Sequence, residues 1–196
     1  MRNKKFGKFF MIFGTVLLAA ALSLFLFNKI EEIRAQKNAE NVLSLLTEAE
    51  NQNGDGEQQE SPNSEMTTKE IDGYDYIGYL FIPSENLKLP VMAEWDYTRL
   101  KISPCRFSGS VKTDDLIICA HNYKKHFGRI YCLSEGDQII FTDMDGNDWT
   151  YYVETVEKIS PYDIDKISSQ YALTLFTCTY AGKSRVVVRC SRGEDR

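Results

Sequence analysis

The sequence has little of several residue types that usually mark a metal or cofactor site. Only two histidines and five cysteines occur among its 196 residues, and no two cysteines form a CxxC pair. These spacings exclude the common zinc patterns, and the odd cysteine count leaves at least one thiol outside any intrachain disulfide. Low counts of glycine (12) and proline (5) exclude a collagen-like or low-complexity chain. We therefore expect a globular domain that needs no metal and no cofactor.

The sequence also lacks an excess of basic charge. It carries 23 lysine and arginine residues against 28 aspartate and glutamate residues, for a net charge of −5. The acidity is concentrated in residues 49–72, where seven carboxylates accompany Lys69 alone. Because a nucleic-acid-binding protein usually presents a basic surface, we expect no nucleic-acid partner.

One long apolar run is present near the N-terminus. Residues 9–27 contain no charge, and at about 1.5 Å per residue they are long enough to cross a hydrocarbon core of roughly 30 Å. Small residues at 19–21 would suit a cleavable signal peptide, but apolar residues follow them and favour an uncleaved anchor. Basic residues precede the run and predict a single-pass membrane protein with a cytoplasmic N-terminus: Arg2, Lys4, Lys5 and Lys8.

The composition divides the chain into five parts. After a basic N-terminus (1–8) and the membrane anchor (9–27), scattered apolar residues predict a helical stalk over 28–50. Residues 51–72 read as a flexible acidic linker, since 51–65 lacks apolar side chains that could offset the entropy of ordering. Residues 73–196 form the extracellular domain, which the stalk and linker would hold at a set distance above the membrane.

The extracellular domain shows strand signals almost throughout. Short helical turns are expected at 97–102 and 126–133, and a hairpin turn at 145–147. This pattern predicts an all-β, antiparallel-rich barrel or sandwich. Seven β-branched or aromatic segments are the candidate strands: residues 76–82, 87–92, 115–120, 138–142, 149–159, 173–179 and 185–190.

Three residues at strand ends could carry chemistry. His121 follows the apolar run 116–120, Cys178 ends the strand that begins at Leu173, and Arg185 opens the last strand after a short turn. A hairpin between the last two strands would bring Cys178 and Arg185 together. A thiol, an imidazole and a guanidinium supply a nucleophile, an acid/base and an oxyanion stabiliser.

These residue types suit acyl transfer through a thioester. Neighbouring cations raise the thiolate fraction of a cysteine, and arginine remains charged at any working pH. Imidazole titrates near neutrality and can protonate a leaving amine. Two other residues could fill these roles. Arg189 shares the strand face of Arg185 and could replace it, and His126 could replace His121, although it lacks a strand-end position.

The sequence motifs around these residues resemble those of the sortase family. TLFTC at 174–178, followed by an arginine that opens the final strand, is similar to the family's cysteine signature. AHN at 120–122 resembles its histidine segment, and IGYLFIP at 77–83 with LPV at 89–91 resembles its opening strands. The resemblance covers roughly residues 74–192, with the motifs in the family's order.

This resemblance implies a specific enzyme. Sortases are membrane-anchored cysteine transpeptidases of Gram-positive bacteria with an eight-stranded β-barrel. They cleave a Leu-Pro-X-Thr-Gly-like sorting signal of a surface protein after the threonine and join it to an amine of a cell-wall precursor or a pilin lysine. The implied roles are nucleophile for Cys178, general acid/base for His121, and substrate and oxyanion holder for Arg185.

Departures from the family pattern bear on the subfamily. No second hydrophobic span follows Arg189 and no aromatic lid motif precedes the barrel, so we do not expect a pilin-polymerising class C enzyme. Only about a dozen residues separate 149–159 from Leu173, which leaves little space for the long helix of class B enzymes, although segments 103–109 and 120–128 resemble that class. A compact class A-, D- or B-like enzyme is the expectation. The acidic stretch 143–148 resembles half a calcium loop but is better explained as a hairpin turn. A purely hydrolytic cysteine peptidase and an inactive surface-binding barrel are the alternatives.

Overall fold

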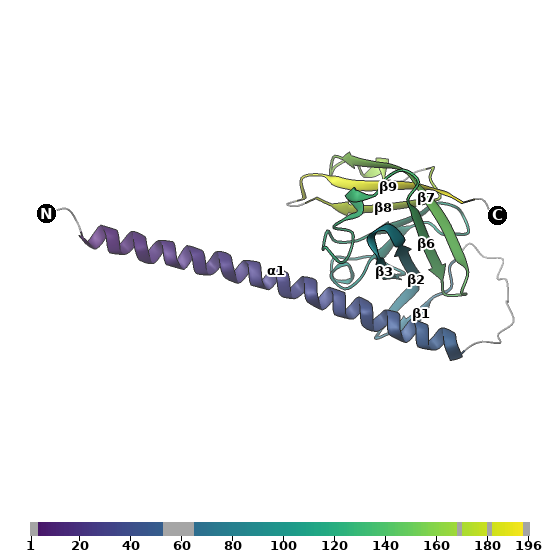
Figure 1. Ribbon diagram of the computed structural model, residues 1–196, viewed down its shortest axis with the longest axis horizontal. Helices are drawn as coiled ribbons and strands as arrows, with labels where there is room; N and C mark the ends of the chain where they lie inside the picture. Colours follow the sequence, from purple (N-terminus) through teal and green to yellow (C-terminus); the bar gives the residue numbers. More distant parts are fainter. Residues whose placement is uncertain (1–3, 53–64, 168–169, 180–181, 194–196) are drawn as a thin grey trace.

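A single long helix forms the N-terminal part of the protein. The computed structural model describes residues 4–52, 65–167, 170–179 and 182–193, and α1 spans Lys4–Gln52 (Figure 1). Its apolar side chains over residues 9–27 are exposed almost throughout. The helix is long and apolar enough to cross a membrane. The expected anchor and stalk are therefore parts of one continuous helix.

The second half of α1 packs against the β-domain instead of standing clear of it. The N-terminal half projects away from the domain, whereas the C-terminal half lies along it (Figure 1). The spacing of the docked residues is that of one helix face, so burial of apolar area holds the helix in place. Four residues of this face are buried: Ala35, Ala39, Val42 and Leu46.

The β-domain is built from nine strands and short 3-10 turns. The strands are β1 (Lys69–Ile71), β2 (Tyr74–Ile82), β3 (Leu87–Met92), β4 (Cys105–Ser108), β5 (Leu116–Cys119), β6 (Gln138–Asp143), β7 (Asp148–Ile159), β8 (Leu173–Cys178) and β9 (Arg185–Arg192). The turns are η1 (Pro83–Glu85), η2 (Arg99–Lys101), η3 (Ile130–Cys132) and η4 (Ile164–Lys166). All seven predicted strands are present, and η2 and η3 fall within the predicted helical turns.

Eight of these strands close into a barrel, as the family resemblance implies. Their order is β2-β3-β4-β5-β8-β9-β7-β6, and β6 pairs back to β2. At this closure Gly78 lies opposite Asp143, and a Cβ atom on Gly78 would meet the Thr142 carbonyl oxygen at 2.1 Å. Only glycine fits where the first and last strands of the barrel meet.

Two strands were absent from the sequence prediction. β4 is four residues long, contains Arg106 and has an irregular register against β5, so it gives no alternating pattern. β1 pairs with β2 within the range expected for the linker, and Ile71 is buried there. The sheet therefore begins at Lys69, whereas most of the expected linker, residues 53–64, lies outside the described residues.

Alternating side chains place two apolar layers on the two faces of the barrel wall. Val186, Val188 and Cys190 of β9 belong to the interior cluster, whereas Val187 points to an outer cluster. The outer cluster includes Phe176 of β8, and α1 covers part of it through Val42 and Leu46. The strand that leads to Cys178 is thus packed on both faces, which makes it a rigid support.

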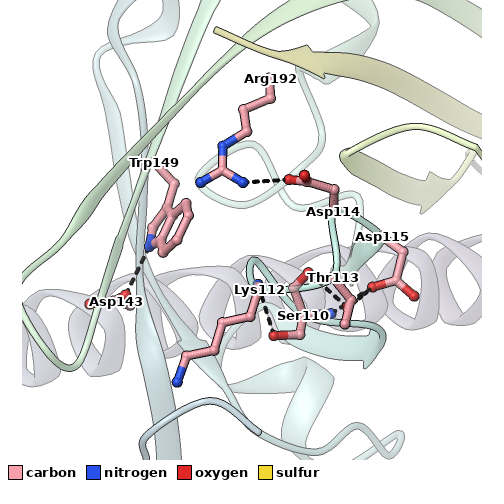
Figure 2. Close-up of polar contacts among 8 residues, drawn as sticks. All are labelled: Ser110, Lys112, Thr113, Asp114, Asp115, Asp143, Trp149 and Arg192. Carbon is pink, nitrogen blue, oxygen red and sulfur yellow. Dashed lines mark hydrogen bonds and ion pairs between the residues drawn. The ribbon is translucent and has the colours of Figure 1, made fainter. Parts of the chain in front are cut away.

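Polar contacts fasten the end of β9 that lies away from Arg185 (Figure 2). Arg192 forms a 2.7 Å ion pair with Asp114 and lies over the Trp149 ring, 4.2 Å from its centroid. The Trp149 indole donates to Asp143 at 2.8 Å, and that carboxylate also accepts the Asn147 backbone N–H. Asp143 therefore holds the predicted β6–β7 hairpin turn together.

Candidate active site

Cys178 and Arg185 lie directly opposite each other on neighbouring strands. Cys178 is the last residue of β8, Arg185 is the first of β9, and the two are register partners in the antiparallel pair. The side chain of Cys178 is exposed. The end of β8 and the start of β9 lie on the side from which the N-terminal half of α1 extends (Figure 1). The predicted hairpin juxtaposition is confirmed.

His121 is brought to the same end by the parallel pairing of β5 and β8. Cys119 is the register partner of Phe176, and the Ala120 N–H donates to the Phe176 carbonyl at 3.2 Å. The Thr177 hydroxyl donates to the Ala120 carbonyl at 2.7 Å. Both backbone groups of Ala120, its N–H and its carbonyl, are therefore hydrogen-bonded to β8. His121 follows Ala120 in the chain, and Cys178 follows Thr177.

The surroundings of His121 favour a neutral imidazole. Burial lowers its pKa, and the positive charge of Lys101 lowers it further, while Glu31 on α1 opposes the effect. The Tyr123 ring lies 5.1 Å from the imidazole, centroid to centroid. At neutral pH the imidazole can therefore accept a proton.

Arg185 makes one side-chain hydrogen bond among the described residues. Its Nη1 atom donates to the carbonyl oxygen of Pro161, in the connection between β7 and β8. Its Nε atom is buried and meets no hydrogen-bond partner in the part of the chain that the structure describes. The residue as a whole is half-buried, so the other N–H groups of its guanidinium can meet a negatively charged ligand oxygen.

The remaining cysteines differ from Cys178 in their surroundings. Cys105, Cys119 and Cys190 are buried, and all five cysteines are free thiols. Burial raises the pKa of Cys119 to about 12 and that of Cys190 to about 12, so both remain protonated thiols at neutral pH. Cys132 is exposed and lies on η3, outside the strands that carry Cys178 and Arg185.

The two substitutes considered from the sequence are occupied or enclosed. Arg189 forms a 2.6 Å ion pair with Glu157 and also donates to the Lys166 carbonyl, so its guanidinium fastens the β7–β8 connection. His126 is only 1% exposed, and neither ring nitrogen meets a partner among the described residues. His126 is therefore enclosed by protein, whereas Cys178 is exposed.

Two contributions to this site were not predicted from the sequence. Thr177 links the strand that carries Cys178 to the strand that leads to His121, and the carbonyl of Pro161 orients Arg185. The TLFTC motif contains Thr177, but its partner lies 57 residues away and is visible only in the fold. The catalytic roles of Cys178, His121 and Arg185 themselves stay predictions.

A comparison with protein families identifies the domain that carries these residues. The family model described as the sortase domain matches residues 80–193, more than half of the chain. No curated protein matches the chain. The matched range contains the strand ends at which Cys178, His121 and Arg185 lie.

Solved structures of sortases share the fold. Sortase A from Corynebacterium diphtheriae aligns with a TM-score of 0.57 and 23% identity, over 63% of this chain and 63% of its own length. The alignment thus spans less than two thirds of that protein. Sortase C1 from Streptococcus agalactiae gives 0.55 and 24%, over 65% and 72% of the two chains. Sortase C from Clostridium perfringens gives 0.54 and 22%, over 81% and 91%. The match of the sortase domain over most of the barrel establishes that this chain belongs to the sortase family.

Proposed function

We propose that this protein is a membrane-anchored cysteine transpeptidase that cleaves a Leu-Pro-X-Thr-Gly-like sorting signal after its threonine. The acyl group would pass to an amine of a cell-wall precursor or of a pilin lysine. The observation that supports this proposal most directly is that an exposed thiol, Cys178, lies opposite Arg185. The buried Nε of Arg185 has no hydrogen-bond partner among the described residues. His121 follows a segment that β8 holds in place.

The first half of the reaction forms a thioester. Cys178 Sγ attacks the threonine carbonyl while the neutral imidazole of His121 takes up the thiol proton. The negative oxygen of the tetrahedral intermediate is stabilised by the Arg185 guanidinium. When the Thr–Gly bond breaks, the imidazolium gives its proton to the leaving amine. The lowered pKa of His121 supports this proton transfer, since the imidazolium is then a good acid.

The second half regenerates the enzyme. An acceptor amine attacks the thioester carbonyl, His121 removes a proton from the amine, and the Cys178 thiolate leaves. The product is a new amide bond, and the proton on the imidazolium returns to the thiolate. Water in place of the amine would give hydrolysis, so access of the acceptor decides between transpeptidase and peptidase.

The long apolar helix supports a location at the cell membrane. Residues 9–27 expose apolar side chains that lipid would cover, and four basic residues precede them. In this topology the N-terminus is cytoplasmic and the barrel is outside. The partners are surface proteins that carry sorting signals.

A peptide assay tests the proposal. The full-length protein in detergent micelles is incubated with a Leu-Pro-X-Thr-Gly peptide, with and without a glycine-peptide or lysine amine. The proposal predicts cleavage between threonine and glycine and, with the amine, a new amide product. Cleavage with no amide product under any acceptor would indicate a hydrolytic peptidase. No cleavage across a panel of related signals would indicate an inactive surface-binding barrel.

A further inference from the structure

The docked part of α1 carries a carboxylate to the loop that contains His121. The buried face of the helix reaches from Leu46 back to Ala35, and Glu32 continues it one turn nearer the N-terminus. Val42 and Leu46 pack in the outer cluster of the barrel wall, together with residues of β2 and β3. Glu32 is therefore placed by a packed helix and not by a freely moving segment.

Glu32 makes a specific contact with the barrel. Its Oε1 atom accepts a 3.1 Å hydrogen bond from the backbone N–H of Lys124, and its Oε2 atom pairs with Lys29 Nζ at 2.6 Å. The hydrogen bond from Lys29 is the main cause that lowers the pKa of Glu32, and the Lys124 N–H adds to it. An ionised carboxylate makes a stronger hydrogen bond to an N–H than a neutral acceptor does.

The loop that Glu32 contacts is folded back on itself. The N–H groups of His126 and Gly128 each donate to the Tyr123 carbonyl at 2.9 Å, and the Phe127 N–H donates to the His121 carbonyl at 3.2 Å. A Cβ atom on Gly128 would lie 2.6 Å from the Tyr123 carbonyl oxygen, so the turn is as tight as glycine allows. His126 and Phe127 are buried and fix one side of the loop, while Lys124 lies at its exposed tip.

We propose that Glu32 is a positioning residue for His121. By holding the Lys124 N–H it fixes the tip of the loop, and this keeps the Tyr123 ring against the imidazole, 5.1 Å between centroids. Glu32 acts through Lys124 and touches no substrate. The inference rests on the proposed function, and it means that the helix that anchors the protein also orients its acid/base.

Cleavage kinetics of the full-length protein in detergent micelles test this role. Glu32→Ala removes the acceptor, and we expect kcat for peptide cleavage to fall about tenfold, with KM within about twofold, because the substrate does not contact Glu32. Glu32→Gln retains an amide oxygen at the same distance from the backbone. Its kcat should lie within about threefold of wild type, since a neutral acceptor replaces a charged one.

Two variants on the same helix are matched controls. Glu40 is exposed on α1 and accepts only from Gln36 Nε2 at 2.7 Å among the contacts described, so Glu40→Ala should leave kcat unchanged. Lys29→Ala removes the partner of Glu32 but leaves the Lys124 contact, and should also be near wild type. Wild-type kcat in Glu32→Ala, or an equal loss in Glu40→Ala, would overturn the proposal.

Hydrogen exchange separates this inference from the enzymatic proposal. Peptide-level exchange over residues 120–129 should be faster in Glu32→Ala than in wild type, and unchanged in Glu40→Ala, with residues 138–143 of β6 as an internal reference. If the wild-type protein cleaves no peptide, the proposed function fails and exchange alone decides whether Glu32 holds the loop. Unchanged exchange over 120–129 would contradict that contact.

Discussion

The hydroxyl of Thr177 donates a 2.7 Å hydrogen bond to the carbonyl oxygen of Ala120, across the parallel pair of β5 and β8. Both residues are buried, and each is followed directly by a proposed catalytic residue, Cys178 after Thr177 and His121 after Ala120. One side-chain contact thus joins the two strands one residue before the thiol and the imidazole. It does so at the point where two strands far apart in the sequence end together.

Removing this hydrogen bond should lower stability and activity together. Thr177→Val keeps the shape of the side chain but leaves the Ala120 carbonyl unpaired in a buried position, at a cost of about 1–3 kcal/mol in the free energy of unfolding. We expect a lower melting temperature and a lower kcat for peptide cleavage. Thr177→Ser retains the hydroxyl and should recover most of the activity; equal loss in both variants would contradict the role of this bond.

The two arginines of β9 should respond differently to substitution. Arg185→Lys keeps the charge but loses the forked donor geometry, including the buried Nε, so kcat should fall by more than about tenfold with little change in melting temperature. Arg189→Lys should instead lower the melting temperature, because it weakens the contacts to Glu157 and to the Lys166 carbonyl. A near-normal kcat in Arg185→Lys would move the oxyanion role to another donor.

Acid should destabilise the fold through His126. Burial lowers its pKa from 6.5 to about 4, and the nearby His121 adds to the effect. Between these two pH values the unfolded chain binds a proton that the folded chain does not, so stability is present above pH 6.5 and is lost as pH falls toward 4. The full shift corresponds to about 3 kcal/mol.

A variant isolates this contribution. His126→Met is apolar and similar in size, so the fall in melting temperature between pH 7 and pH 4.5 should be smaller than in wild type. His121 contributes in the same direction, because burial also lowers its pKa, and should leave a residual slope. An identical pH dependence in wild type and His126→Met would show that the His126 imidazole is not the buried neutral group described above.

The intact mass of the expressed protein tests the anchor. If residues 9–27 are an uncleaved membrane helix, protein extracted from membranes should have the mass of the full chain, and removal of residues 1–27 should release it into the soluble fraction. The truncated chain retains Ala35–Leu46 contacts with the barrel and should stay folded. A mature protein that begins after residue 21 would indicate a cleaved signal peptide instead.

The sequence predicted the barrel better than the surroundings of the site. Strands such as β8 and β9 were predictable because they are rich in β-branched and aromatic residues. The short connection between them predicted an antiparallel hairpin, which places Cys178 opposite Arg185. β4 could not be predicted, since it is short, irregular and partly polar. The stalk was expected to be a spacer because Ala35 and Ala39 carry little hydrophobic signal, although small side chains let the helix approach the barrel closely.

Contacts made by backbone atoms were the least predictable part of the site. The bond from Lys124 N–H to Glu32 spans 92 residues, and the carbonyl of Pro161 that orients Arg185 lies 24 residues away. Neither has a residue-type signature, because every residue presents the same backbone groups. The lowered pKa of His121 likewise depends on burial and on Lys101, which the chain brings near only when folded.

Mass spectrometry of the acyl-enzyme tests the central claim most directly. The full-length protein is incubated with a Leu-Pro-X-Thr-Gly peptide and no amine, quenched in acid and mapped by tandem spectra. We predict an acyl adduct on Cys178 that disappears when an amine acceptor is added, no adduct in Cys178→Ala, and a normal adduct in Cys132→Ala, the other exposed thiol. Cleavage that persists in Cys178→Ala, or an adduct on Cys132 in its place, would contradict the account.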